Sequence, residues 1–317
     1  PESINVIPLF EDASSLLNAH KIVEGYLKDK NLEYQRVFLA RSDPALNYGA
    51  LSAVLLLNIA LQRLDSLEKR LGVAIYPILG VGSAPFRGNF KPTNAGEMVM
   101  GYRSCQTFTV QSAFKYDWPQ EVVKQAIKEV RAAPRGSPLI IAEEKALAIV
   151  RKATATYQEQ VREIARIVNS ISPFVPRRRL RKLHVGLFGY ARKSGKSSLP
   201  RAITFCAALY SIGLPPELLG LSGINRKDLK DIEELYPSPN FEIDLRDAMR
   251  FYNPSCLSLL SHGLRKQVEK SATIIDSEPD AEHKEITDRI IHRLHRGQTD
   301  HISEYIVKAA RIRRFLG

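Results

Sequence analysis

The stretch YQRVFLARSDPALNYG, Tyr34 to Gly49, joins a short apolar run to the start of a helix. Its first seven residues, Tyr34 to Ala40, are rich in aromatic and branched side chains and have the length of a buried strand. Ser42, Asp43 and Pro44 follow, and a short polar residue before proline is typical of a helix N-terminus. A strand that passes through a short turn into a helix is the building unit of an α/β protein.

The same order of strand and helix recurs along the chain. Apolar runs predict four further strands, at Ile4–Phe10, Val73–Leu79, Thr107–Val110 and Leu183–Phe188. Helical spacing predicts the helices Leu16–Leu27, Ala45–Leu71, Gln120–Ala133 and Ala142–Ser172, and an almost wholly helical region from Leu199 onward. Short apolar strands that alternate with helices predict a parallel sheet with both faces covered.

Five such strands could form an open doubly wound sheet or most of a (β/α)₈ barrel. Polar side chains that follow several different strands favour the barrel, because barrel enzymes carry their reactive groups at the C-terminal strand ends. These residues are Glu11, Asp43, Arg87, Gln111 and Arg192. We therefore predict an α/β fold, part of a TIM-like (β/α)₈ barrel elaborated with many helices, with the C-terminal third almost all helical.

The predicted organisation is one structural unit in two parts. Residues 1–198 would form βα units that make up most of the barrel and its active-site edge, and residues 199–317 would form a helical region packed on it. Five strands are fewer than a barrel needs, and the first predicted strand begins only three residues after Pro1. We expect the remaining strands upstream of this sequence.

Composition places the chain among globular proteins, with 44% hydrophobic and 25% charged residues. The longest apolar run, Ala50 to Leu61, is too short to span a bilayer, and no signal peptide opens the chain, so no membrane partner is expected. Three widely spaced cysteines fit neither a disulfide framework nor a zinc site. They predict a reducing, cytoplasmic location.

The net charge of +12 has two explanations, nucleic-acid binding or an active site that attracts small polyanions. The densest basic run, residues 177–182, lies between Pro176 and a predicted strand and is typical of a solvated linker. Neither zinc-finger spacing nor an aromatic RNA-binding signature accompanies it. We expect no nucleic-acid partner, although a basic nucleic-acid-binding protein stays an alternative.

Glu11 and Asp43 follow successive strands and could converge on one Mg²⁺ or Mn²⁺ ion. Such hard cations take oxygen ligands and complete their shell with water and substrate. The alternative is that each carboxylate caps the helix that follows it.

Two glycine-containing segments could bind an anion. The loop GVGSAPFRGNF, Gly80 to Phe90, allows close backbone approach, and Arg87 can bind phosphate or carboxylate bidentately, although a plain loop has the same composition. Residues 189–198 lie between a strand and a helix, as a P-loop does, but five residues separate Gly189 from Gly195 where a P-loop has four. A P-loop NTPase is therefore the weaker alternative.

Taken together, the ordered motifs resemble the archaeal-type phosphoenolpyruvate carboxylases over nearly the whole chain. The motifs are PLFED (8–12), ARSDPALNYG (40–49), GVGSAPFRGN (80–89), TFTVQSAFKYDWP (107–119), LFGYAR (187–192) and LPRAITFCAALYSIGLPPELLG (199–220). The resemblance implies a carboxy-lyase that forms oxaloacetate and phosphate from phosphoenolpyruvate and bicarbonate, through carboxyphosphate and the pyruvate enolate. It also implies Mg²⁺ or Mn²⁺ as cofactor and a homo-oligomer, with a tetramer suspected.

The matched motifs imply roles for individual residues. Glu11 and Asp43 stand where the family has its metal ligands, and Arg87 stands where a loop arginine stabilises the transferring phosphate. Gln111 matches the glutamine after the fourth strand. Arg192 resembles the arginine that holds phosphoenolpyruvate, and Arg201 is matched as a further substrate-binding residue.

Two positions depart from the bacterial and plant branch of this family. Val81 stands where that branch has a second loop arginine, and Leu46 stands where it has a lysine. The resemblance also places the catalytic histidine in an N-terminal region that this sequence does not contain. We expect the chain to cover about three-fifths of such an enzyme and to be inactive alone.

Overall fold

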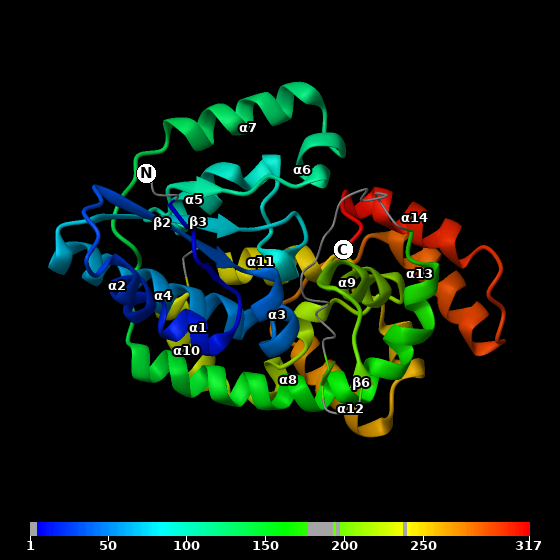
Figure 1. Ribbon diagram of the computed structural model, residues 1–317. Coiled ribbons are helices and arrows are strands. Elements are labelled where there is room, and N and C mark those ends of the chain that lie inside the picture. Colours follow the sequence, from blue (N-terminus) through cyan, green and yellow to red (C-terminus); the bar gives the residue numbers. More distant parts are fainter. Residues whose placement is uncertain (1–4, 177–192, 195–196, 237–239) are drawn as a thin grey trace.

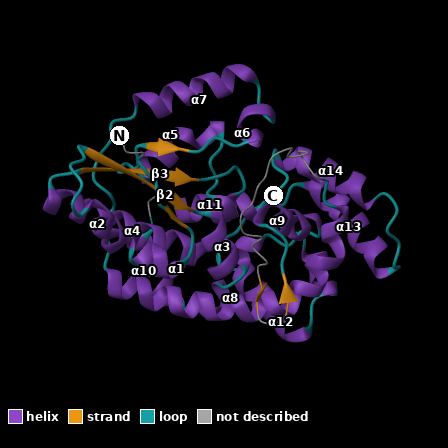
Figure 2. Ribbon diagram, in the orientation of Figure 1, coloured by secondary structure: helices purple, strands orange, loops and turns teal. Residues whose placement is uncertain are grey.

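A parallel four-stranded sheet in the order β1-β2-β3-β4 organises the first half of the molecule. The computed structural model describes residues 5–176, 193–194, 197–236 and 240–317, and these residues form an α/β structure that is mostly helical (Figures 1 and 2). The strands are β1 (Leu9–Phe10), β2 (Tyr34–Ala40), β3 (Ala74–Gly80) and β4 (Thr107–Phe108). A separate antiparallel pair consists of β5 (Lys193–Ser194) and β6 (Ser197–Ser198).

The longest pairing joins β2 to β3, in register from Tyr34 opposite Ala74 to Ala40 opposite Gly80. Val37 and Leu39 of β2 and Ile75 and Leu79 of β3 are buried, as alternation in a strand requires for one face of a sheet. In the view of Figure 1, α1 (Ala13–Leu17), α2 (Ala19–Leu27) and α4 (Ala50–Leu71) lie on one side of these strands, with α7 (Gln120–Ala132) on the other.

The remaining helices continue from this sheet into the C-terminal region. They are α3 (Ser42–Tyr48), α5 (Ala95–Gly101), α6 (Ser112–Tyr116), α8 (Glu143–Ile171), α9 (Ala202–Ser211), α10 (Arg226–Leu235), α11 (Asn240–Met249), α12 (His262–Ala272), α13 (Ala281–His295) and α14 (Ile302–Arg313). Short 3₁₀ turns include η1 (Pro85–Arg87), which follows β3, and η4 (Pro216–Leu218), which follows α9. Helix α8 packs along α4 and also contacts α3, α9 and α10, so it joins the two parts of the chain.

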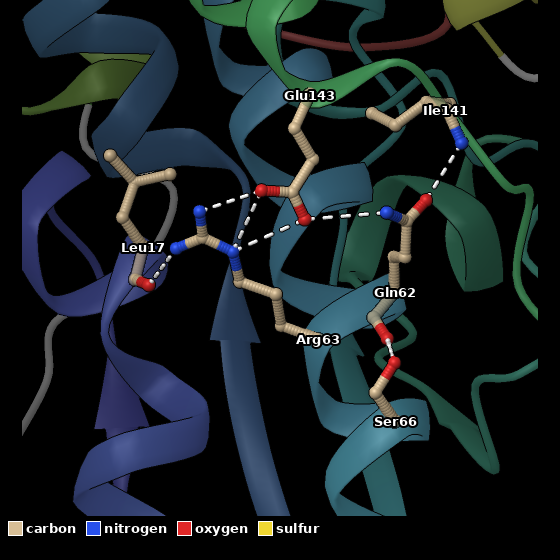
Figure 3. Close-up of polar contacts among 6 residues, drawn as sticks. All are labelled: Leu17, Gln62, Arg63, Ser66, Ile141 and Glu143. Atoms are coloured by element: carbon tan, nitrogen blue, oxygen red, sulfur yellow. Dashed lines mark hydrogen bonds and ion pairs between the residues drawn. The ribbon is translucent and has the colours of Figure 1, made fainter.

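A polar clamp fixes the start of α8 against α4 and the end of α1 (Figure 3). Arg63 on α4 donates to both carboxylate oxygens of Glu143, at 2.6 to 3.2 Å, and to the Leu17 carbonyl at 2.5 Å. Neighbouring Gln62 donates to Glu143 and accepts from the Ile141 backbone N–H at 2.7 Å. Glu143 lies in the first turn of α8, where a negative charge also stabilises the helix dipole.

Helix α4 is the one helix within the described ranges that is long and apolar enough to cross a membrane by itself, while α9 with the turn after it would qualify only as a pair bent by 100°. In α4, 72% of the most apolar window is buried in the protein. Its apolar length is therefore accounted for by packing against the sheet and α8.

Several predicted boundaries were wrong. The predicted helix Ala45–Leu71 is two helices, α3 and α4, interrupted at Gly49, whose φ of 90° no helix residue adopts. The predicted helix Leu16–Leu27 is likewise divided at Asn18 between α1 and α2. The first strand contains only Leu9 and Phe10, since it pairs with β2 over just those residues.

The predicted strand Tyr34–Ala40 is confirmed at both ends. The predicted fifth strand, Leu183–Phe188, lies outside the described residues. The parallel sheet and the helical C-terminal region are also confirmed.

Replacing Gly49 with alanine is expected to destabilise the protein by about 2 kcal/mol, because the backbone conformation at this position strains any other residue. An added Cβ would also lie 3.1 Å from the ring of Tyr157. Gly25, exposed in α2 with no atom within 4 Å of an added Cβ, is the matched control. Gly25→Ala should stabilise by roughly 0.5–1 kcal/mol. Urea unfolding measures both, and an equal effect of the two substitutions would contradict the strain at Gly49.

Candidate functional site

The C-terminal ends of four parallel strands meet at one edge of the sheet. Phe10 pairs with Leu39, Ala40 with Gly80, and Leu79 with Phe108, so the residues that follow these strands emerge side by side. The residues that follow are the predicted ligands and binding groups, namely Glu11, Asp43, the loop with Arg87, and Gln111.

Arg87 and Gln111 are in direct contact at this edge. The guanidinium of Arg87 donates a hydrogen bond through Nη2 to Oε1 of Gln111, although the two residues are 24 positions apart. Gly82 lies beneath the pair, and a Cβ there would come within 2.7 Å of Gln111 Oε1 and closer still to the Arg87 guanidinium. A residue with a Cβ at position 82 would therefore require the ends of both side chains to move.

The loop that carries Arg87 is an ordered part of the core rather than a plain surface loop. All ten residues from 81 to 90 are buried. The backbone N–H of Gly82 donates to the Arg87 carbonyl at 2.9 Å, and the N–H of Phe90 donates to the Gly82 carbonyl at 2.8 Å. Thr109, which follows β4, also accepts from the Val81 N–H at 2.9 Å. These bonds hold Arg87 in place before any substrate arrives.

Helix capping does not account for Glu11 or Asp43. Asp12, not Glu11, is the N-cap of α1, and its carboxylate accepts from the Ser15 N–H at 3.0 Å. The N-cap of α3 is Arg41, without a side-chain capping bond, and Asp43 lies inside the first turn. Both carboxylates are half-buried. Among the described residues Glu11 makes no hydrogen bond or ion pair, and carboxylate oxygens are the ligand type that a hard cation prefers.

In the parts of the chain that the structure describes, no three His, Cys, Asp or Glu side chains form a group that could hold a metal by themselves. That finding rules out a closed, zinc-like cage within those ranges. It is compatible with a cation that has two carboxylate ligands and takes the rest from water and substrate.

Two further residues, Arg192 and Arg201, are predicted to bind substrate. Arg192 lies outside the described residues. Arg201 is the exposed N-cap residue of α9 and has no contact with Arg87 or Gln111 among the described hydrogen bonds.

The segment considered as a P-loop has a different local structure. Lys193–Ser194 and Ser197–Ser198 pair as antiparallel strands, and α9 begins only at Ala202. A P-loop lysine and serine would instead open a helix. This geometry argues against the nucleotide-binding alternative.

The comparisons with known proteins cover the whole chain. Residues 1–317 match the family described as phosphoenolpyruvate carboxylase. The chain belongs to this family. Proteins called phosphoenolpyruvate carboxylase are 48% identical in Methanothermobacter thermautotrophicus, 46% in Halobacterium salinarum and 43% in Pyrococcus furiosus, each over 100% of this chain. The chain spans 64% of the length of each of these relatives.

Membership in the phosphoenolpyruvate carboxylase family confirms the archaeal-type resemblance inferred from the motifs. The two departures from the bacterial and plant branch are both buried apolar positions. Val81 is 1% exposed and Leu46 is 2% exposed. A charged side chain would be costly at either place, which fits the apolar residues of this chain.

A buried polar cluster that the sequence did not predict lies beside the loop. It contains Arg41, Asn89, Tyr236 and Asp244, all buried, with the Asp244 carboxylate in contact with the other three. Arg41 and Asn89 lie within motifs of the phosphoenolpyruvate carboxylase resemblance, which could have identified them. Asp244 is outside every motif, and no sequence signal marked it.

Glu217 of η4 is a further buried carboxyl near the loop. It accepts a hydrogen bond from the Tyr210 hydroxyl at 2.7 Å. Burial raises the pKa of Glu217 to about 7. The hydrogen bonds from Tyr210 and from the backbone of Glu217 and Phe86 lower this pKa, but burial has the larger effect. A cavity of about 20 Å³, with room for one water molecule, is lined by Glu217, Arg41 and Asp244 among others.

Glu217 is expected to make stability pH-dependent. A carboxyl whose pKa rises from 4.5 to about 7 on folding binds its proton more tightly in the folded state, so stability falls as pH rises through this window. Glu217→Gln removes the ionisation. The free energy of unfolding of Glu217→Gln minus that of wild type should therefore rise by roughly 2 kcal/mol from pH 5 to pH 8.

Urea unfolding at the two pH values measures this change, with the exposed Glu121→Gln on α7 as the matched control. If the free energies of unfolding of Glu217→Gln and wild type differed by the same amount at both pH values, the raised pKa would be contradicted.

Proposed function

We propose that the protein to which this chain belongs carboxylates phosphoenolpyruvate with bicarbonate, giving oxaloacetate and phosphate. The observation that carries the proposal is the contact of buried Arg87 with half-buried Gln111 at the strand edge from which Glu11 and Asp43 also emerge. Relatives that bear the name phosphoenolpyruvate carboxylase and match the whole chain support it.

Glu11 and Asp43 would hold the divalent cation, Mg²⁺ or Mn²⁺. The donor set fits, since both groups are carboxylates at adjacent strand ends and neither caps its helix. The cation would supply Lewis-acid stabilisation of the phosphate and enolate oxygens.

Arg87 would stabilise negative charge as the phosphoryl group moves. In the proposed reaction a bicarbonate oxygen attacks phosphorus, and the bond from phosphorus to the enol oxygen breaks. Carboxyphosphate then releases CO₂ and phosphate, and the enolate carbon attacks CO₂. The buried guanidinium of Arg87 is already held by its hydrogen bond to Gln111, so it needs little reorganisation to stabilise this charge. Gln111 would orient Arg87 and contact substrate.

Arg192 and Arg201 complete the proposed substrate-binding groups. The resemblance assigns Arg192 to phosphoenolpyruvate, and Arg201 is exposed and so accessible to an anionic ligand. Arg192 would act as a catalytic group if it reaches the same phosphate as Arg87.

We also propose that the described sheet is part of a (β/α)₈ barrel, with residues 1–198 and 199–317 in one structural unit. The four strands follow one another in sequence order without the reversal of a doubly wound sheet. Exposed apolar residues flank both edge strands, namely Val6, Ile7 and Leu9 at β1 and Val110 after β4. Additional strands of a longer protein would cover them, as the 64% coverage of the relatives suggests.

The setting proposed for the enzyme is a cytoplasmic homo-oligomer, with a tetramer suspected from the family. Cys105, Cys206 and Cys256 are all free and buried, as in proteins of a reducing compartment.

Oxaloacetate formation by the full-length protein tests the function directly. We expect activity that requires phosphoenolpyruvate, bicarbonate and Mg²⁺ or Mn²⁺ together. The oxaloacetate is measured through NADH oxidation by added malate dehydrogenase. The 317-residue chain alone should be inactive, because the resemblance places the catalytic histidine outside it. Absence of activity in the full-length protein would overturn the proposal, and full activity of the isolated chain would overturn the need for a further histidine.

Asp43→Asn in the full-length protein should raise the Mn²⁺ concentration for half-maximal activity by about tenfold or more, because a neutral amide binds a hard cation less tightly. Asp231→Asn is the matched control, since Asp231 pairs with Lys145 on the surface. Unchanged metal dependence in Asp43→Asn would remove Asp43 from the metal site.

A further inference from the structure

Helix α11 comes from the helical C-terminal region and packs against η1, the turn that contains Arg87. Asp244 on this helix is 8% exposed and has two sets of partners. One partner lies in the segment that follows β2, and another lies in the loop that follows β3. The Asp244 carboxylate therefore connects the ends of two strands.

On the β2 side, the partner of Asp244 is Arg41. The guanidinium of Arg41 is 1% exposed, lies 3.9 Å from Asp244 Oδ2 and donates to the Tyr102 hydroxyl at 3.3 Å. The Tyr236 hydroxyl donates to the same Asp244 oxygen at 2.7 Å. Arg41 directly follows β2 and is two residues before Asp43.

On the β3 side, the partner is Asn89, two residues after Arg87. The Asn89 amide donates to Asp244 Oδ1 at 2.9 Å and to Asp247 Oδ2 at 3.0 Å. Lys91 is ion-paired with Asp247 at 2.8 Å and neutralises this second carboxylate. Asn89 has a φ of 52°, a left-handed conformation that asparagine tolerates better than most residues. The side chain is therefore directed into α11 from a loop whose backbone is already fixed.

We propose that Asp244 is a positioning residue that sets the distance between the metal carboxylate Asp43 and the phosphate-stabilising Arg87. It does not touch substrate, and it acts through Arg41 on one strand end and through Asn89 on the other. This role rests on the proposed carboxylase function.

The chemistry of the cluster fits positioning better than stabilisation. A buried ion pair gains little net stability, because desolvation of both charges offsets their attraction. The hydrogen bonds that Asp244 accepts from Asn89 and Tyr236 nevertheless have strict geometry and specify one arrangement of the elements that they join. Phosphoryl transfer depends on such placement, and a shift of about 1 Å in a catalytic group can lower the rate about a hundredfold.

The test uses three single variants of the full-length protein and the double variant that combines Asp244→Asn with Asn89→Gly. Asp244→Asn keeps the shape of the side chain but removes the charge that faces Arg41. Asn89→Gly removes the amide hydrogen bonds to Asp244 and Asp247 and suits the left-handed backbone. Asp231→Asn is the surface control. Circular dichroism and thermal unfolding identify temperatures at which every variant is folded, and kcat, KM for phosphoenolpyruvate and Mn²⁺ activation are measured there.

We expect kcat to fall about tenfold or more in Asp244→Asn and in Asn89→Gly, with no more than about a twofold change in KM. The double variant should lose little beyond the larger single loss, because both substitutions break the same connection. Asp231→Asn should match wild type. A kcat of folded Asp244→Asn within twofold of wild type, or losses that multiply in the double variant, would overturn the proposal.

An inactive wild type would instead overturn the proposed carboxylase function. In that case, crystal structures of wild type and Asp244→Asn test the positioning claim. Displacement of the 81–90 loop relative to the end of β2 would support the claim, and an unchanged loop would overturn it.

Discussion

The parallel pairing of β2 with β3 is the constraint on which the rest of the site depends. Seven consecutive residue pairs, from Tyr34 opposite Ala74 to Ala40 opposite Gly80, bring both strands to an end at the same level. The α3 helix with Asp43 and the loop with Arg87 start from adjacent points as a result. A slip of one residue would turn Val37 and Leu39 away from the core, so burial of these side chains also fixes the position of the chemistry.

The groups at this edge are held by several weak restraints and not by one strong bond. Arg87 is bonded to Gln111, its backbone is bonded to Gly82, and its loop is bonded through Asn89 to α11. Most of these partners are buried, where an unmade hydrogen bond is expensive. The loop is consequently preorganised, which is what stabilisation of a transferring phosphate requires. Helix α11 belongs to the C-terminal region, and the site therefore depends on parts of the chain far apart in sequence.

Sequence patterns predicted those features that local chemistry determines. The β2 strand was predicted to the residue because its apolar run is bounded by polar residues. The common sheet edge of Glu11, Asp43, Arg87 and Gln111 was predicted because each residue follows a strand. The interruption at Gly49 was missed because the apolar spacing continues across it, and the backbone φ of 90° in the structure reveals the turn. Asp244 could not be predicted, since its partner Asn89 is 155 residues away. The barrel and the functional roles of all the site residues stay predictions, namely Glu11, Asp43, Arg87, Gln111, Arg192 and Arg201.

The central claim is that Glu11 and Asp43 bind one divalent cation beside Arg87. Anomalous diffraction from crystals of the full-length protein grown with Mn²⁺ and phosphoenolpyruvate tests it most directly. We predict one manganese peak at about 2.1 Å from an oxygen of each carboxylate, with the substrate phosphate between the metal and Arg87. A manganese peak bound to neither carboxylate, with phosphoenolpyruvate present in the crystal, would contradict the account.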